Sequence, residues 1–285
     1  MTGHRGLIGS SLLQRLVDRG DAAADLIDSR EGGDILKIND RKDAGQVDMM
    51  IHLASFCKIN KIVKEPRLSF RNNVAGTEEV LEYCRERNIP KIVFTSTSRI
   101  LSPEKNPYTA GKIYGEELCR GYSGAYGIDH VIIRPSTVYG PFNDKTKRLT
   151  DIFIINALTG KPLIINGDKN KTLDFTYVDD FVDATLLAIE QKNESYDVSG
   201  GEEVNVTDLA NYIIKLNGGA GSIIYEPAEV AQPQKVKLDI SKIRSLGYEP
   251  KVSLEDGIRR CYDWYKKNLS EVLSTRDENL LMNAA

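Results

Sequence analysis

The chain has 285 residues, a net charge of −3 and a pI near 5.8, so it presents no basic field for nucleic acid. No apolar run is long enough to span a membrane, no signal peptide opens the chain, and four cysteines lie scattered without paired spacing. We expect a cytoplasmic protein without a metal site, because the three histidines form no ligand cluster.

The first predicted element is a glycine-rich turn followed by a helix. Gly3, Gly6 and Gly9 recur at every third position, and 10–19 then has the apolar stripe of a helix. Such a turn lets backbone N–H groups approach a pyrophosphate, toward which the positive end of the helix points. Because only two residues precede Gly3, we expect a truncated first strand and a natural start upstream. If instead the chain is complete, cofactor affinity should be poor and the slot at the centre of the sheet open or refilled.

Strands and helices then alternate as in a doubly wound parallel α/β sheet. The predicted strands are 25–28, 48–54, 91–96 and 129–134, and the predicted helices are 66–88 and 107–122. Beyond Pro141 the alternation loosens into 149–159, 162–166 and the helices 206–216 and 254–268. A polar tail, 270–285, is expected to fray.

A second glycine series and an aspartate refine the prediction of a dinucleotide site. Gly121, Gly124 and Gly127 repeat the same spacing between a helix and a strand, the reverse of the order that phosphate binding requires, so we interpret them as a helix stop and connector. Asp28, at the end of the second strand, can accept hydrogen bonds from ribose hydroxyls and would repel a 2′-phosphate. This favours NAD over NADP, although Arg30 could accommodate a phosphate and Asp28 could instead be a solvated loop acid.

A tyrosine and a lysine provide the candidate chemistry. Tyr108 and Lys112 lie four residues apart on one face of a predicted helix, where a cation would favour the phenolate and let Tyr108 act as a base. Tyr262 and Lys266 have the same spacing in a C-terminal helix whose apolar residues indicate core packing, so the spacing alone does not identify a catalytic pair. Only Tyr108 follows a strand end rich in hydroxyls, at 95–98, and the alternative is a surface tyrosine with a solvated lysine.

Taken together, these motifs resemble the extended short-chain dehydrogenase/reductases, and specifically their NAD-dependent epimerase/dehydratase type. The chain looks most like the UDP-galactose (UDP-glucose) 4-epimerase branch. The shared motifs are TGxxGxxG at 2–9, HLA at 52–54, NVxGT at 73–77, YxxxK at 108–112, RPSTVYGP at 134–141 and DFTYVDD at 174–180. The resemblance implies a Rossmann domain over 1–146 with a return segment at about 172–192. It also implies a smaller C-terminal α+β substrate-binding region over 147–171 and 193–269, followed by the tail.

The resemblance also implies a role for each matching residue. Thr97, Tyr108 and Lys112 would be catalytic, with Lys112 also holding the nicotinamide ribose. Thr97, Thr137 and Lys235 would contact a nucleotide sugar. The residues implied to line NAD are Gly3, Gly6, Gly9, Asp28, Leu53, Ala54, Asn73, Tyr108, Lys112, Pro135 and Ser136. The implied reaction is a redox-neutral epimerisation of a UDP-hexose through a transient 4-keto sugar in a homodimeric enzyme.

Four departures from the family pattern leave other functions open. The loop between Thr97 and Tyr108 has ten residues, fewer than in relatives, and Arg99-Ile100-Leu101 stands where the family has Val-Tyr-Gly. Leu173 stands where the family has a phosphate-binding arginine, and Cys57 occupies a position on the substrate side. A 4,6-dehydratase is disfavoured because Ser98 and Arg99 replace its acidic pair. A keto-sugar reductase is disfavoured because it would use NADPH, whose 2′-phosphate Asp28 would repel. A cofactor-binding sensor or scaffold is the alternative outside the enzymes.

Overall fold

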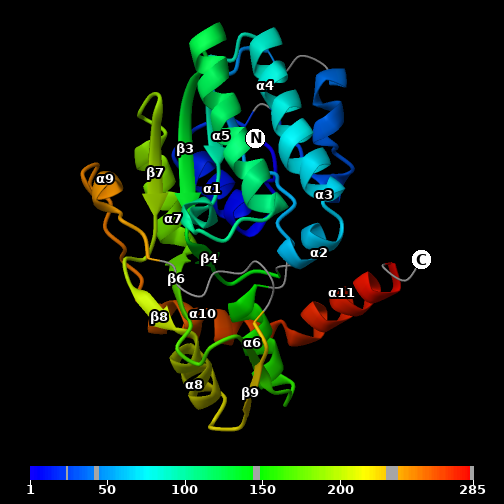
Figure 1. Cartoon of the computed structure of the whole chain (residues 1–285), viewed down its shortest axis with the longest axis vertical. Helices are drawn as coiled ribbons and strands as arrows, with labels where there is room; N and C mark the ends of the chain where they lie inside the picture. The colour runs from blue at the N-terminus through cyan, green and yellow to red at the C-terminus, as the bar shows by residue number, and fades with distance from the viewer. Residues whose placement is uncertain (24, 42–44, 144–147, 229–236, 283–285) are drawn as a thin grey trace.

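The computed structural model describes the chain except residues 24, 42–44, 144–147, 229–236 and 283–285. Its main sheet has four parallel strands in the order β1-β2-β3-β7. These strands are β1 (Met50–His52), β2 (Lys91–Thr95), β3 (Asp129–Pro135) and β7 (Glu194–Val198). Helices cover both faces (Figure 1), so the predicted doubly wound α/β class is confirmed.

The residues ahead of the glycine turn join the main sheet through isolated bridges. Thr2 makes single parallel bridges to Ile27 on one side and to His52 on the other. The Thr2 N–H donates to the Ile51 carbonyl at 2.9 Å, and the Gly3 N–H donates to the Ile27 carbonyl at 2.8 Å. Of the strand predicted over 25–28, only the bridge at Ile27 forms, because its partner is one residue long.

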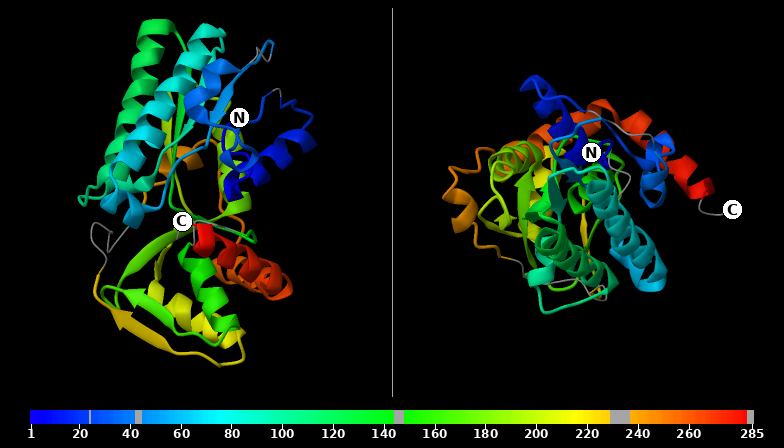
Figure 2. Two further views of the ribbon diagram at one scale, coloured as in Figure 1. Left: turned by 90° about the vertical axis from the view of Figure 1, so that its right-hand side faces the viewer. Right: turned by 90° about the horizontal axis from the view of Figure 1, so that it is seen from above.

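Two helical layers enclose the sheet (Figure 2). On one face α1 (Leu7–Asp18) packs against α7 (Val178–Ala188), and on the other α4 (Gly76–Glu86) packs against α5 (Pro107–Tyr126). The helix predicted over 66–88 is α3 (Arg67–Ser69), a π-helical turn η3 (Phe70–Ala75) and α4 in succession. The shorter helical segments are η1 (Ser29–Glu31), η2 (Ile35–Asp40), α2 (Ile59–Lys64) and η4 (Ser98–Leu101).

A second region lies beyond the carboxyl ends of these strands (Figure 1). Its strands are β4 (Thr137–Tyr139), β6 (Thr172–Tyr177) and β8 (Glu203–Asn205) in one sheet and the pair β5 (Leu163–Asn166) and β9 (Ile223–Glu226). Its helices are α6 (Leu149–Leu158), α8 (Val206–Leu216), α9 (Ser241–Arg244), α10 (Leu254–Lys267) and α11 (Leu269–Met282). One hydrophobic cluster spans both regions, from Leu12 and Val131 to Phe153 and Ile213, and the division into two domains stays a prediction.

Two segments that we expected to be irregular, 121–127 and the tail from residue 270, are largely helical. Gly121 and Gly124 lie inside α5, which ends at Gly127 with a φ of 72°, so only Gly127 stops the helix. The tail predicted from residue 270 begins as α11, whose Val272 is buried in the main core. Among the described residues, no helix combines the length and apolarity needed to cross a membrane.

Candidate active site

The glycine turn lies directly against the chain that leaves β1. A Cβ atom on Gly3, whose φ is 75°, would lie 2.8 Å from the Ala54 nitrogen, and one on Gly9 would lie 2.2 Å from the Gly3 carbonyl oxygen. Gly6 is the N-cap of α1, and it contributes no side-chain cap to the first-turn N–H groups. Glycine is therefore required for close packing, and the helix presents free N–H groups of the kind that bind a pyrophosphate.

Asp28 lies beside this turn and is buried. Its carboxylate accepts the Arg5 N–H and the Arg30 N–H, each at 2.9 Å. Arg30 donates to the Arg5 carbonyl, and its guanidinium carbon lies 5.8 Å from the centre of the Phe142 ring. A carboxylate in this position suits an adenosine ribose, so the turn and Asp28 together fit a dinucleotide.

The residues predicted to line the cofactor next to the turn are held by short contacts. The Thr2 hydroxyl accepts the Ala54 N–H at 3.2 Å, and the Leu53 N–H donates to the Thr2 carbonyl at 3.2 Å. Asn73 is buried, and its amide bonds the Phe56 N–H at 2.8 Å and the Phe56 carbonyl at 2.9 Å. In this structure Asn73 therefore fixes the loop that follows Ala54.

The local sequence explains why α5 begins just before Tyr108. The side chain of Asn106 accepts the N–H groups of Tyr108 at 2.9 Å and Thr109 at 3.1 Å, and Pro107 occupies the first helical position. Tyr108 is buried and hydrogen-bonds to the hydroxyl of Thr97, which caps η4. The structure thus brings the predicted hydroxyl and phenol together.

Burial acts in opposite directions on the two ionisable groups of α5. It raises the pKa of Tyr108 to about 12 and lowers the pKa of Lys112 to about 8. Lys112 donates its Nζ to the Thr95 carbonyl at 2.7 Å, and it lies 4.8 Å above the ring of Phe94. We expected Lys112 to lower the pKa of Tyr108, but the cations that lower it here are Arg99 and Arg148.

Two further residues close to Tyr108 carry little signal in the sequence. Arg148 donates to the Val138 carbonyl at 2.9 Å and lowers the pKa of Tyr108, but it lies in a connecting segment outside every motif. Cys57 packs with Tyr108 in a small apolar cluster and raises its pKa after the larger effect of burial. The sequence indicates Cys57 only as a departure from the family pattern.

The segment expected beside the nicotinamide lies where β3 passes into β4. The Ser136 N–H donates to the Val198 carbonyl at 2.9 Å, and its hydroxyl lies 2.5 Å from that of Thr176. Asp174 bonds Ser136 and Ser199, while desolvation raises its pKa to about 6. Pro135 ends β3, and Thr137 opens β4 beside this network.

Some predicted substrate contacts are not brought together. Lys235 lies outside the described residues. Leu173, at the position of the expected phosphate-binding arginine, is buried in the core. Within the part of the chain that the structure describes, no cluster of three His, Cys, Asp or Glu side chains could hold a metal ion.

Comparisons with known proteins agree with this geometry. The NAD dependent epimerase/dehydratase family model matches residues 1–206. A putative UDP-glucose 4-epimerase of Methanocaldococcus jannaschii is 32% identical over 300 residues, covering 94% of this chain and 98% of the relative.

Two solved structures with the same fold show the range of reactions among similar proteins. The UDP-glucose 4-epimerase of Thermotoga maritima, solved with UDP-glucose, is 26% identical with a TM-score of 0.83, covering 94% of this chain and 98% of that one. A double mutant of the dTDP-glucose 4,6-dehydratase of Streptomyces venezuelae, bound to NAD, is 26% identical with a TM-score of 0.84, covering 94% and 97%. NAD is the cofactor that the glycine turn and Asp28 fit, and the chain belongs to the NAD-dependent epimerase/dehydratase family.

Proposed function

We propose that this protein is a UDP-hexose 4-epimerase. The observation that carries the proposal is the buried contact between the phenol of Tyr108 and the hydroxyl of Thr97, one helical turn from the ammonium of Lys112. These groups can hold a sugar hydroxyl and move its proton. Similarity to the epimerases of M. jannaschii and T. maritima supports the choice of a UDP-hexose.

Each residue of the site has its own role in the proposed redox-neutral epimerisation. Bound NAD+ would supply reversible hydride exchange with carbon 4 of the sugar. Tyr108 removes the proton of the 4-hydroxyl and gives it back, while Thr97 bonds the same oxygen. The positive charges of Arg99 and Arg148 stabilise the phenolate that Tyr108 forms. Lys112 holds the nicotinamide ribose.

Arg99 favours epimerisation over dehydration. A dehydratase must protonate the leaving hydroxyl of carbon 6 and remove the proton on carbon 5, and the family's dehydratases do this with acids just after the catalytic threonine. Ser98 and Arg99 occupy that place here. A guanidinium stays charged at neutral pH and cannot act as a general acid.

The proposal includes contacts to the rest of the substrate and to a second subunit. We assign the sugar side to Thr97 and Thr137, and the diphosphate to Lys235 together with Arg148, whose guanidinium is close to Tyr108. We also assign the active enzyme to a homodimer formed through the segment 66–88 and α5.

Incubation with UDP-glucose and, separately, UDP-galactose without added reductant tests the proposal. We expect both reactions to reach the same mixture of the two sugars, measured by chromatography, while the bound NAD is neither consumed nor released. A protein that carries NAD but interconverts neither sugar contradicts the proposal. Formation of a 4-keto-6-deoxy product would instead assign it to the dehydratases.

A further inference from the structure

A buried carboxylate lies one helical turn beyond Lys112 on α5. Glu116 follows Lys112 by four residues, so the two side chains share one face of the helix. Only 2% of Glu116 and 4% of Lys112 is exposed. Side chains of this kind are almost never buried so completely unless they are paired, so both charges depend on their neighbours.

Two arginines hold Glu116. Arg134 of β3 donates to both carboxylate oxygens, at 2.8 and 2.7 Å, and Arg120 of α5 donates a third hydrogen bond at 3.1 Å. The remaining terminal nitrogen of the Arg134 guanidinium lies 3.6 Å from the carboxylate of Asp197 on β7. Burial opposes the ionisation of Glu116, but hydrogen bonds and charge from the arginines hold its pKa below the usual value of a glutamate. The carboxylate is therefore ionised at neutral pH and fixed in one orientation.

The neighbours of Lys112 on the main sheet carry no charge. Its Nζ donates to the Thr95 carbonyl at 2.7 Å and lies 4.8 Å from the centre of the Phe94 ring, and both of these residues belong to β2. His52 of β1 is neutral, because burial and then the charge of Lys112 lower its pKa to about 3. The sheet therefore offers the ammonium a carbonyl and an aromatic face, but no anion.

Glu116 supplies the negative charge that the sheet does not. Burial lowers the pKa of Lys112 to about 8, and the groups that oppose this effect are Cys57, Cys119 and Glu116. The two thiols carry no charge unless they lose a proton, whereas the Glu116 carboxylate is ionised throughout the neutral range. Tyr108, one turn before Lys112, is a neutral phenol because burial raises its pKa to about 12. Among the described residues that act on Lys112, Glu116 is therefore the anion at neutral pH.

We propose that Glu116 is a positioning residue that acts through Lys112. Its carboxylate, anchored to β3 by Arg134, keeps the Lys112 ammonium charged and in place. Arg134 directly precedes Pro135, so the same ion pair joins α5 to the segment assigned to the nicotinamide. The proposal rests on the role proposed above for Lys112 at the nicotinamide ribose, and Glu116 acts on the cofactor only through that lysine.

The titration of Lys112 tests the proposal without cofactor or sugar. In protein labelled with 13C-lysine, the Lys112 signal is the one that Lys112→Arg lacks, and NMR follows its midpoint between about pH 6 and pH 10. Glu116→Gln keeps the size of the side chain and an acceptor for Arg134 but removes the charge, so the midpoint should fall by about one unit. Glu116→Asp keeps the charge and should shift it by less than half as much. An unchanged midpoint in Glu116→Gln overturns the proposal.

A double variant covers the case in which Glu116→Gln does not fold. Glu116→Gln combined with Arg134→Gln leaves neither member of the ion pair buried with its charge unpaired, so it should fold. Because Glu116 lies on the same helix face as Lys112 and Arg134 lies beyond it, the midpoint should still fall, by about half a unit. A midpoint at or above that of the wild type contradicts the proposal.

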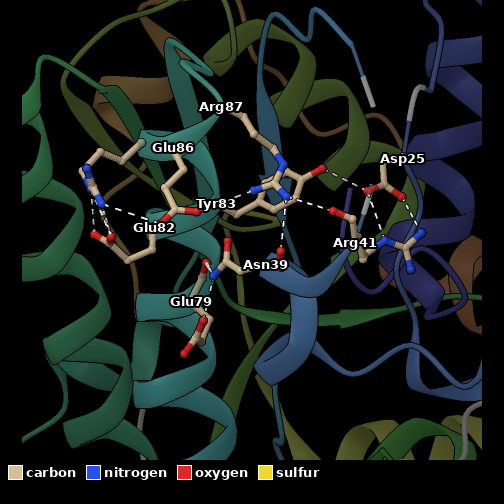
Figure 3. Close-up of polar contacts among 9 residues, drawn as sticks. Asp25, Asn39, Arg41, Glu79, Glu82, Tyr83, Glu86 and Arg87 are labelled. Atoms are coloured by element: carbon tan, nitrogen blue, oxygen red, sulfur yellow. Dashed lines mark hydrogen bonds and ion pairs between the residues drawn. The ribbon is translucent and has the colours of Figure 1, made fainter. Parts of the chain in front are cut away.

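Glu82 of α4 provides a matched control (Figure 3). Its carboxylate accepts hydrogen bonds from Arg85 at 3.1 and 2.6 Å and from the hydroxyl of Tyr122 at 2.5 Å. Like Glu116, it is bound by an arginine and joins α5 to a neighbouring element, but Tyr122 lies in a later turn of α5 than Lys112. Glu82→Gln should therefore leave the Lys112 midpoint unchanged, and equal shifts in the two glutamine variants would overturn the proposal.

The affinity for NAD, measured on protein freed of cofactor, separates this role from a merely structural one. If the charged form of Lys112 holds the ribose, the affinity follows the protonated fraction of this lysine. Glu116→Gln should bind NAD about tenfold more weakly than the wild type at pH 9, and less than about twofold more weakly at pH 6, where Lys112 is charged in both. A loss of equal size at both pH values contradicts the proposal. A wild type that epimerises no sugar would refute the proposed function and leave both measurements intact.

Discussion

At the scale of single residues, burial shifts the pKa values of Tyr108 and Lys112, the two ionisable groups of the site on α5, in opposite directions. The pKa of Tyr108 is raised to about 12 and that of Lys112 lowered to about 8, with desolvation the largest cause in each case. At neutral pH the phenol is therefore protonated and the ammonium still mostly charged. The guanidiniums of Arg99 and Arg148 and the Thr97 hydroxyl all lower the pKa of Tyr108, so in the proposed mechanism they favour the phenolate.

Replacing Tyr108 by phenylalanine should remove turnover and preserve the fold. General acid–base catalysis contributes about a hundred- to ten-thousandfold, so kcat for UDP-galactose should fall by that factor, while the circular dichroism spectrum and NAD content stay unchanged. Tyr262→Phe is the matched control, because Tyr262 also precedes a lysine by four residues but bonds Asn217 in the packing of α10. A Tyr108→Phe variant with wild-type kcat would contradict the assignment of Tyr108 as the acid/base.

Asp174 makes stability depend on pH. Desolvation raises its pKa from 3.8 to about 6, so the folded protein binds this proton more tightly than the unfolded chain does. Its contribution to the free energy of unfolding should fall by about 2 kcal/mol as pH rises from 4 to 7. Asp174→Asn lacks this titration. In urea unfolding, the difference in stability between wild type and variant should therefore shift by that amount between pH 4 and pH 7, and a constant difference would contradict the assignment.

At the scale of elements, two glycines on helices test which glycine series binds the cofactor. Gly9→Ala places a methyl group against the backbone of Gly3 and His4, so it should cost about 1–3 kcal/mol of stability and weaken NAD binding. Gly124→Ala, in the second series, meets no atom within 4 Å on an exposed turn of α5 and should stabilise the protein by about 0.5–1 kcal/mol. Urea unfolding measures the stability of the two variants, and titration with NAD measures their affinity. Equal losses of NAD binding in Gly9→Ala and Gly124→Ala would contradict the assignment of Gly3, Gly6 and Gly9 to the cofactor.

The bounds of a helix follow from the sequence where its caps and apolar face are regular, whereas contacts between elements do not. The bounds of α8 match the prediction because Asn205 caps its start and its apolar face is regular. The helix after Gly121 was missed because exposed glycines weaken a helix locally, while contacts along the rest of α5 maintain it. Arg148 near Tyr108 was missed because the contact depends on how α6 is placed against β4, which no local pattern encodes.

At the scale of the whole molecule, the two regions share one hydrophobic core. The largest apolar cluster joins α1 and β3 to α6 and α8. Tyr265 of α10 donates its hydroxyl to the Phe142 carbonyl at 2.7 Å, and the Phe142 ring lies beside Arg30 near Asp28. A continuous set of contacts therefore links α10 to Asp28.

The proposed homodimer has a physical basis on the surface of the first region. Phe70 of η3 is 65% exposed, and Ile113 and Tyr114 of α5, the helix packed against η3, are 37% and 44% exposed. Large apolar side chains gathered on neighbouring segments are typical of interfaces. In sedimentation velocity we expect the wild type at about twice the mass of one 31.8 kDa chain and Phe70→Asp at the mass of one chain. Tyr225→Asp, at a 48% exposed position on β9, should remain dimeric, and a monomeric wild type would contradict the dimer.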